Sequence, residues 1–198
     1  MARLLTNVGR HGGAPQARAG LRAGFFLETL VITLVLFGAA LLVHEGGHLA
    51  VIHAVGGEGV LVVRPWRLSF LEGQIYGLHA QPLTPLNPVQ QLLVNLGGPL
   101  LAAVPIAVLL RLARGPAARI ALGLNLGVLL FYAVIEALYV VLESGFGLEG
   151  EWLTAAELNY GLPALVTLAV LALAATSPEI GQLRAWVVRP QPTGSRLP

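Results

Sequence analysis

Two histidines four residues apart, with a glutamate directly after the first, are the residues of this chain best suited to chemistry. The segment His44-Glu45-Gly46-Gly47-His48 follows the His-Glu-x-x-His pattern. Because residues four apart lie on one face of an α-helix, both imidazoles can reach the same metal ion. Histidine nitrogens bind zinc, and a neighbouring carboxylate can take a proton from water. The pattern therefore predicts His44 and His48 as zinc (Zn2+) ligands and Glu45 as the catalytic base.

The residues around this pattern are almost all apolar. Residues 25–43 contain one charged residue, Glu28, and residues 49–55 are apolar except for His53. Ionisable groups in a membrane helix are costly and usually functional. His53 lies about 140° around the helix from His48, so we expect it to be a packing or interface residue rather than a ligand. The competing interpretation is a helix that uses His44, Glu45 and His48 for internal hydrogen bonds rather than for binding a metal.

The composition predicts an integral membrane protein. Of 198 residues, 56% are hydrophobic and 11% are charged, and the mean hydropathy is +0.75. Such a chain has too little polar surface to cover a soluble globule of this size. The chain contains no cysteine, which excludes disulfides and thiolate metal sites. All twelve basic residues are arginine and all ten acidic residues are glutamate.

Four apolar segments are long enough, or nearly so, to cross a bilayer as helices, which takes about 20 residues. They lie near residues 25–54, 89–112, 117–142 and 162–175. We therefore expect an all-α integral membrane fold with about four transmembrane helices. Its expected parts are a basic cytoplasmic tail over residues 1–23, one transmembrane domain over residues 24–176 and a second cytoplasmic tail over residues 177–198.

Arginines indicate the orientation of the spans, because basic residues favour the cytoplasmic side. They flank the start of the first span, surround the connection between the second and third spans, and follow the fourth. His44 and His48 then lie near the outer surface, and Asn95 and Glu136 fall at a similar depth. We expect a multi-pass protein of a prokaryotic cell membrane. The dispersed arginines form no basic groove, which argues against nucleic-acid binding.

The segment between the first two spans has a different pattern. Residues 59–79 contain β-forming stretches on both sides of a turn near Glu72-Gly73, which predicts a small β-hairpin at the membrane surface. An exposed strand there could pair with a substrate backbone and present it to the metal. Trp66 and Trp152 are typical of side chains that anchor such segments at the membrane interface.

The second span is interrupted by Asn95-Leu96-Gly97-Gly98-Pro99-Leu100. Glycine lets another helix approach closely, and proline removes one backbone hydrogen bond. We therefore expect this helix to pack tightly against a neighbour. The Asn95 amide is a candidate for substrate binding, and a hydrogen bond to another helix is the alternative.

With His44-Glu45-Gly46-Gly47-His48 on one membrane helix and residues 97–100 (Gly-Gly-Pro-Leu) on the next, the chain resembles the site-2 protease family of intramembrane zinc metallopeptidases. The resemblance covers roughly residues 25–160. It implies a three-helix core in which the first motif supplies two zinc ligands and the base, and a Gly-Pro-containing helix packs beside it. It also implies hydrolysis of peptide bonds in or near the membrane segments of other proteins.

The third zinc ligand is where the chain departs from this family, whose ligand is the aspartate of a Leu-Asp-Gly motif. The closest match here is Leu148-Glu149-Gly150, so we expect Glu149 to be the third ligand, since a glutamate also coordinates zinc through oxygen. Glu136, surrounded by apolar and aromatic residues, is the rival, and Glu143 is a further alternative. The family also generally places zinc toward the cytoplasm, whereas the arginines here place it toward the outside.

Two other classes of protein fit the same residues. One is a membrane cofactor protein in which His44 and either His48 or His53 bind haem or another metal. The other is a catalytically silent relative of the protease that binds membrane proteins. The intact Glu45 favours an enzyme over a silent relative. The expected partners of the enzyme are a membrane-protein substrate and the lipid bilayer.

Overall fold

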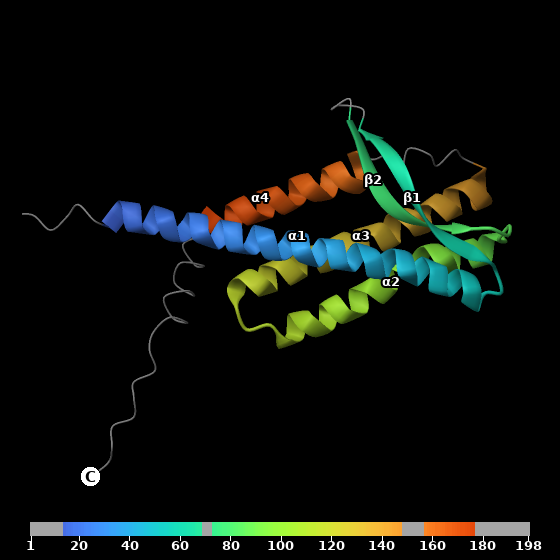
Figure 1. The fold of residues 1–198 in the computed structure, drawn as a ribbon, viewed down its shortest axis with the longest axis horizontal. Coiled ribbons are helices and arrows are strands. Elements are labelled where there is room, and N and C mark those ends of the chain that lie inside the picture. The colour runs from blue at the N-terminus through green and yellow to red at the C-terminus, as the bar shows by residue number, and fades with distance from the viewer. Residues whose placement is uncertain (1–13, 69–72, 148–156, 177–198) are drawn as a thin grey trace, which may run out of the picture.

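The chain folds into a small helix bundle with one β-hairpin. The computed structural model describes residues 14–68, 73–147 and 157–176. The elements are, in order, α1 (Ala14–Ala54), β1 (Gly59–Leu68), β2 (Gly73–Pro82), α2 (Pro88–Leu112), α3 (Pro116–Phe146), the π-helical turn η2 (Glu157–Gly161) and α4 (Leu162–Thr176). Figure 1 shows α1 along the length of the bundle, with the hairpin near the C-terminal end of α1.

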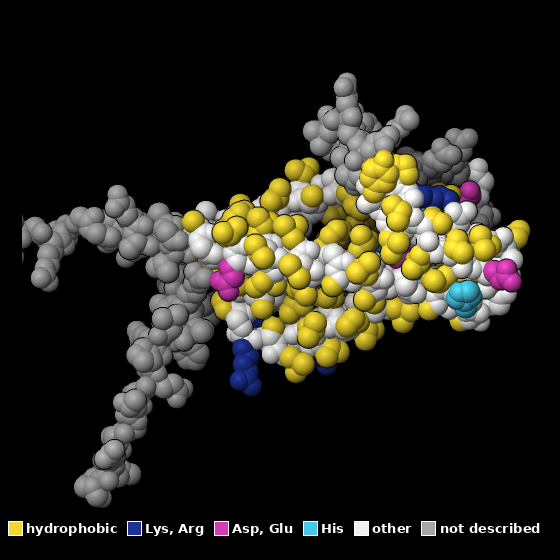
Figure 2. Space-filling model, in the orientation of Figure 1, with side chains coloured by type: hydrophobic (Ala, Val, Ile, Leu, Met, Phe, Trp, Pro, Cys, Tyr) yellow, Lys and Arg dark blue, Asp and Glu magenta, His cyan; other side chains and the backbone are white. Residues whose placement is uncertain are grey.

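Three helices match the first three predicted spans in position, length and apolar character. The stretches Ala23–Ala54, Pro88–Leu112 and Pro116–Phe146 are long and apolar enough to cross a membrane. The apolar helix Leu162–Ala174 is shorter than these three, so a fourth span stays a prediction. Hydrophobic side chains cover the helices in Figure 2, and charged side chains lie mainly toward the two ends of the bundle.

The first helix begins earlier than predicted. It starts at Ala14, within the segment expected to be a tail, and continues to Ala54. The segment between Ala14 and Ala23 is rich in alanine and arginine, which are strong helix formers without being apolar enough to predict a membrane span. Hydropathy therefore located the span but not the start of the helix.

Local sequence signals set the other helix ends. Asn87 caps α2 by accepting a hydrogen bond from the Gln90 backbone N–H, and the Gln90 side chain returns a bond to the Asn87 N–H. The same Gln90 side chain donates to the Val55 carbonyl, which ties the start of α2 to the end of α1. Gly147 ends α3 with a φ of 63°, a conformation that favours glycine.

Helix α2 packs against both α1 and α3, which also contact each other, and α4 contacts α1. The main buried cluster at this junction is rich in alanine, comprising Ala40, Ala102, Ala103, Ile106, Leu122 and Leu129. Small residues let the backbones of packed helices approach closely, which stabilises the bundle through van der Waals contact.

The two strands confirm the predicted hairpin. They pair antiparallel, with Leu61 opposite Ala80 and Val62 opposite His79. Of the predicted turn, Gly73 begins β2 and Glu72 lies outside the described residues. Ala80 packs against Ile52 of α1 and Val94 of α2, so the hairpin lies against the ends of these two helices.

Candidate metal centre

The predicted motif lies on α1, within a continuous helix. The helical spacing puts His44 and His48 on one face, and their Nε2 atoms lie 2.9 Å apart. The residues His44, Glu45 and His48 are 5%, 7% and 8% exposed. Both imidazoles therefore direct a nitrogen to the same buried point between the helices.

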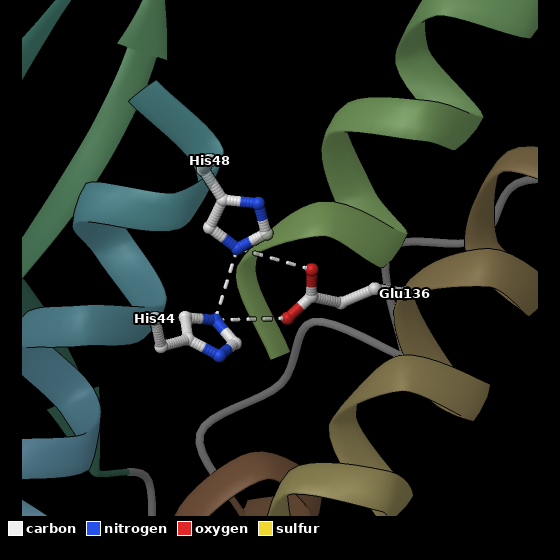
Figure 3. A group of neighbouring side chains, drawn as sticks. All are labelled: His44, His48 and Glu136. Atoms are coloured by element: carbon white, nitrogen blue, oxygen red, sulfur yellow. Dashed lines mark hydrogen bonds and ion pairs between the residues drawn. The ribbon is translucent and has the colours of Figure 1, made fainter. Parts of the chain in front are cut away.

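Glu136 of α3 completes this group. One of its carboxylate oxygens lies 3.2 Å from His44 Nε2, and the other lies 3.3 Å from His48 Nε2. Figure 3 shows the carboxylate turned toward both rings, across the gap between α1 and α3. The three ligand atoms lie within 4.8 Å of one another, so His44, His48 and Glu136 could together hold a metal ion.

The hydrogen bonds of the histidines suit metal binding. His48 Nδ1 lies 2.7 Å from the Val94 carbonyl, which can only accept, so Nδ1 carries the hydrogen and Nε2 keeps its lone pair. Two imidazole nitrogens at 2.9 Å repel each other unless a proton or a cation lies between them. Two nitrogens and a carboxylate oxygen are a donor set typical of zinc enzymes. The residues present therefore fit a zinc ion.

His44 Nδ1 is buried and has no hydrogen-bond partner within the described parts of the chain. Its ring forms edge contacts with His48 and Tyr132, with centroids 4.5 Å and 5.6 Å away. With Nδ1 enclosed in this way, Nε2 is the ring nitrogen of His44 that faces the carboxylate of Glu136. Among the described residues, ring packing rather than a hydrogen bond surrounds the Nδ1 side of His44.

Glu45 is held by the hairpin. Its Oε2 accepts a hydrogen bond of 2.7 Å from the Ala80 backbone N–H of β2, and its Oε1 lies 4.0 Å from His44 Nε2. One oxygen is therefore fixed to a strand while the other faces the metal group. Sequence reasoning missed the Ala80 contact, because a backbone N–H carries no residue-type signal.

Glycines set the distance between α1 and α2. A Cβ added at Gly98 would overlap the His48 ring, and one added at Gly97 would overlap the Val51 side chain. A Cβ at Gly47 would lie 3.0 Å from the Gly98 Cα. This close approach, expected from the glycine pair, brings the Val94 carbonyl within reach of His48.

Asn95 lies beside the metal group and binds two neighbours. Its Oδ1 accepts a hydrogen bond of 2.6 Å from the Gln91 side chain, and its Nδ2 donates to the Glu136 backbone carbonyl at 3.1 Å. The structure thus shows the alternative considered for Asn95, a bond to another helix. Gln91 was not singled out from the sequence, since nothing in its surroundings marks it.

Two further polar side chains approach the group from outside the spanning helices. Burial raises the pKa of Tyr160 on η2 to about 12, and the charges of Glu45 and Glu136 act in the same direction. Burial also lowers the pKa of His79 on β2, as do the charges of Arg64 and His44. Sequence reasoning missed both residues, because only the fold brings them to the motif.

The other candidate residues lie elsewhere. Glu149, expected as the third ligand, and Trp152 are outside the described residues. Glu143 is exposed on α3 and does not belong to the metal-binding group, and His53 is exposed at the end of α1, as expected for a residue that is not a ligand. Only the backbone of Trp66 is described, in β1 opposite Ile75.

Comparison of the chain with protein-family models, curated proteins and solved structures gives no match. The site must therefore be interpreted from its own geometry.

Proposed function

We propose that this protein is an intramembrane zinc metalloprotease that hydrolyses peptide bonds in or near the membrane segments of other proteins. The observation that carries the proposal is the convergence of His44, His48 and the Glu136 carboxylate, with Glu45 beside them. Three helices long and apolar enough to cross a membrane make a membrane setting compatible with the fold. We place the protein in a membrane on this basis.

His44, His48 and Glu136 would hold the zinc ion, in place of the Glu149 ligand expected from the resemblance. When bound, zinc lowers the pKa of a water molecule toward neutrality and polarises a carbonyl group. The ligands on α1 and α3 are buried or half-buried, and the apolar helices around them limit the access of bulk water.

Glu45 would move the protons of the reaction. Its Oε2 is held by the Ala80 N–H, which leaves Oε1 on the side of His44. From there Glu45 is placed to take a proton from the attacking water and to give it to the amine that leaves after the peptide bond breaks. No other described carboxylate is both this close to the histidines and outside the ligand group.

Strand β2 would present the substrate. The Ala80 N–H points to Glu45 and therefore away from β1, and alternate residues of a strand share one edge, so Leu78 turns its N–H and C=O groups the same way. An extended substrate added to this edge would lie directly beside the base and the metal ligands. The hairpin thus connects substrate binding to the reacting groups.

The converging geometry disfavours the haem alternative. Axial haem ligands bind iron from above or below the ring, whereas the two Nε2 atoms here lie 2.9 Å apart, with a carboxylate in contact with both. Such a group fits a single small cation.

The test is cleavage of a library of labelled single-span peptides in liposomes by the purified zinc-loaded protein. Glu45→Gln should keep zinc and lose activity by roughly 10²- to 10⁴-fold, because it removes the base and keeps the ligands. Glu143→Gln, an exposed glutamate on α3, is the matched control and should cleave like the wild type. A Glu45→Gln protein as active as the control would contradict the proposed mechanism.

A further inference from the structure

Helix α2 supplies none of the three proposed ligands, yet two consecutive residues of α2 hold the two helices that do. The Val94 carbonyl accepts a hydrogen bond from His48 of α1, and the next residue, Asn95, donates to the backbone carbonyl of Glu136 on α3. Helix α2 thus contacts both sides of the metal group. Its hydrogen bonds hold in place the proposed ligands that lie on α1 and α3.

The direction of both Asn95 bonds follows from the Glu136 carbonyl, and Gln91 holds the Asn95 amide in that orientation. The Asn95 amide lies between the Gln91 side chain and the Glu136 carbonyl. Since the carbonyl can only accept, the NH₂ group of Asn95 must face Glu136, and its oxygen then accepts from the Gln91 NH₂ group. Gln91 and Asn95, one turn apart on α2, form a short chain of hydrogen bonds that ends at the ligand residue of α3.

Glu136 is the ligand that most needs such support. Its side chain is 23% exposed, against 6% for His44 and 10% for His48, so it is the least enclosed of the three. It is also the one ligand outside the helical motif, so its distance from the histidines depends on how α3 is held against α1 and α2.

We infer that Asn95, oriented by Gln91, is a positioning residue that holds Glu136 in place and slows the release of zinc. This inference rests on the proposed zinc site and assigns Asn95 a role other than the substrate binding expected from the sequence. A substrate-binding residue would change KM and leave metal retention unchanged. A positioning residue changes metal retention in the absence of any substrate.

The test is the rate at which a chelator removes zinc from detergent-purified protein without substrate. Asn95→Ala should release zinc faster than the wild type, by roughly 10- to 100-fold if the effect matches the loss of metal affinity that follows removal of an outer-shell partner. The matched control is Asn125→Ala, because Asn125 of α3 also donates its amide to a carbonyl of another helix, that of Thr33. Asn125 lies eleven residues from Glu136, roughly 16 Å along α3, so its loss should leave zinc release unchanged.

Gln91→Glu tests the direction of the hydrogen bonds with almost no change of shape. A carboxylate cannot donate, so two acceptors meet in either orientation of the Asn95 amide, at residue 91 or at the Glu136 carbonyl, and the chain of hydrogen bonds is broken. Zinc release should therefore be faster, although the added negative charge by itself would favour the cation.

The outcomes separate this inference from the proposed function. Faster release in Asn95→Ala and in Gln91→Glu, but not in Asn125→Ala, would support it. If Asn95→Ala does not fold, the isosteric Gln91→Glu variant decides alone. Wild-type release rates in either variant, or equal losses in all three, would overturn the inference while leaving the zinc site intact. A wild type that holds no zinc would overturn the proposed function and the inference with it.

Discussion

At the scale of residues, the site depends on the short distances between its side chains. The Nε2 atoms of His44 and His48 lie 2.9 Å apart and each is within 3.3 Å of a Glu136 oxygen, so a side chain added against one of these groups would displace it. Gly98 is the position where this is most direct, since a Cβ there would overlap the His48 ring.

Gly98→Ala should therefore weaken both the fold and the metal site. Overpacking of this kind costs about 1–3 kcal/mol, and moving the His48 ring should lower zinc occupancy. Gly123→Ala on α3 is the control, because a Cβ there meets no atom within 4 Å among the described residues, and alanine is the better helix former. Thermal unfolding in detergent and zinc content measure both effects. Equal behaviour of the two variants would contradict the close packing of α1 on α2.

At the scale of elements, the hairpin provides the contact that fixes Glu45, the proposed base. Ala80→Pro removes the N–H that binds Glu45 without breaking a bond to β1, because this N–H points away from β1. We expect zinc to be retained and kcat to fall roughly 10- to 100-fold, as for other residues that orient a reacting group. Ala80→Gly keeps the N–H and should stay close to wild type, so a similar loss in both variants would contradict the role given to this N–H.

Much of the element structure could be predicted from the sequence, because burial in lipid requires apolar stretches about as long as the bilayer is thick. Ala23–Ala54, Pro88–Leu112 and Pro116–Phe146 follow from that requirement, and β-forming stretches on both sides of a turn predicted the hairpin. The motif on α1 was visible in the sequence because its residues are close together and its two histidines share one helical face.

Glu136, the carboxylate that lies beside His44 and His48, could not be singled out from the sequence in this way. Glu136, Glu143 and Glu149 are all carboxylates near or beyond the end of the apolar segment 117–142, and the local signals conflict, since a motif match favours Glu149 and apolar neighbours favour Glu136. The choice depends on the height and rotation of α3 against α1, which are set by tertiary contacts such as Asn95 with Glu136, 41 residues apart. The hydrogen bond from the Ala80 backbone N–H to the Glu45 side chain joins residues 35 apart, so it could not be predicted from the sequence for the same reason.

At the scale of the whole molecule, a metal ion held by His44, His48 and Glu136 would join α1 to α3 and should stabilise the bundle. A ligand that binds only the folded protein, present at a hundred times its Kd, adds about 2.7 kcal/mol to stability. Removal of zinc with a chelator should therefore lower the unfolding temperature, and zinc should restore it. Magnesium should not, since it prefers oxygen ligands. An unfolding temperature insensitive to zinc would argue against a metal that bridges the two helices.

The most direct measurement of the central claim is the zinc content of detergent-purified protein by elemental analysis, comparing the wild type with His44→Ala, Glu136→Ala and Glu149→Ala. We expect close to one zinc per wild-type chain, strong loss in His44→Ala and Glu136→Ala, and retention in Glu149→Ala. Zinc lost in Glu149→Ala but kept in Glu136→Ala would contradict the ligand set proposed from the structure. A folded wild-type protein without zinc would contradict the metalloprotease itself.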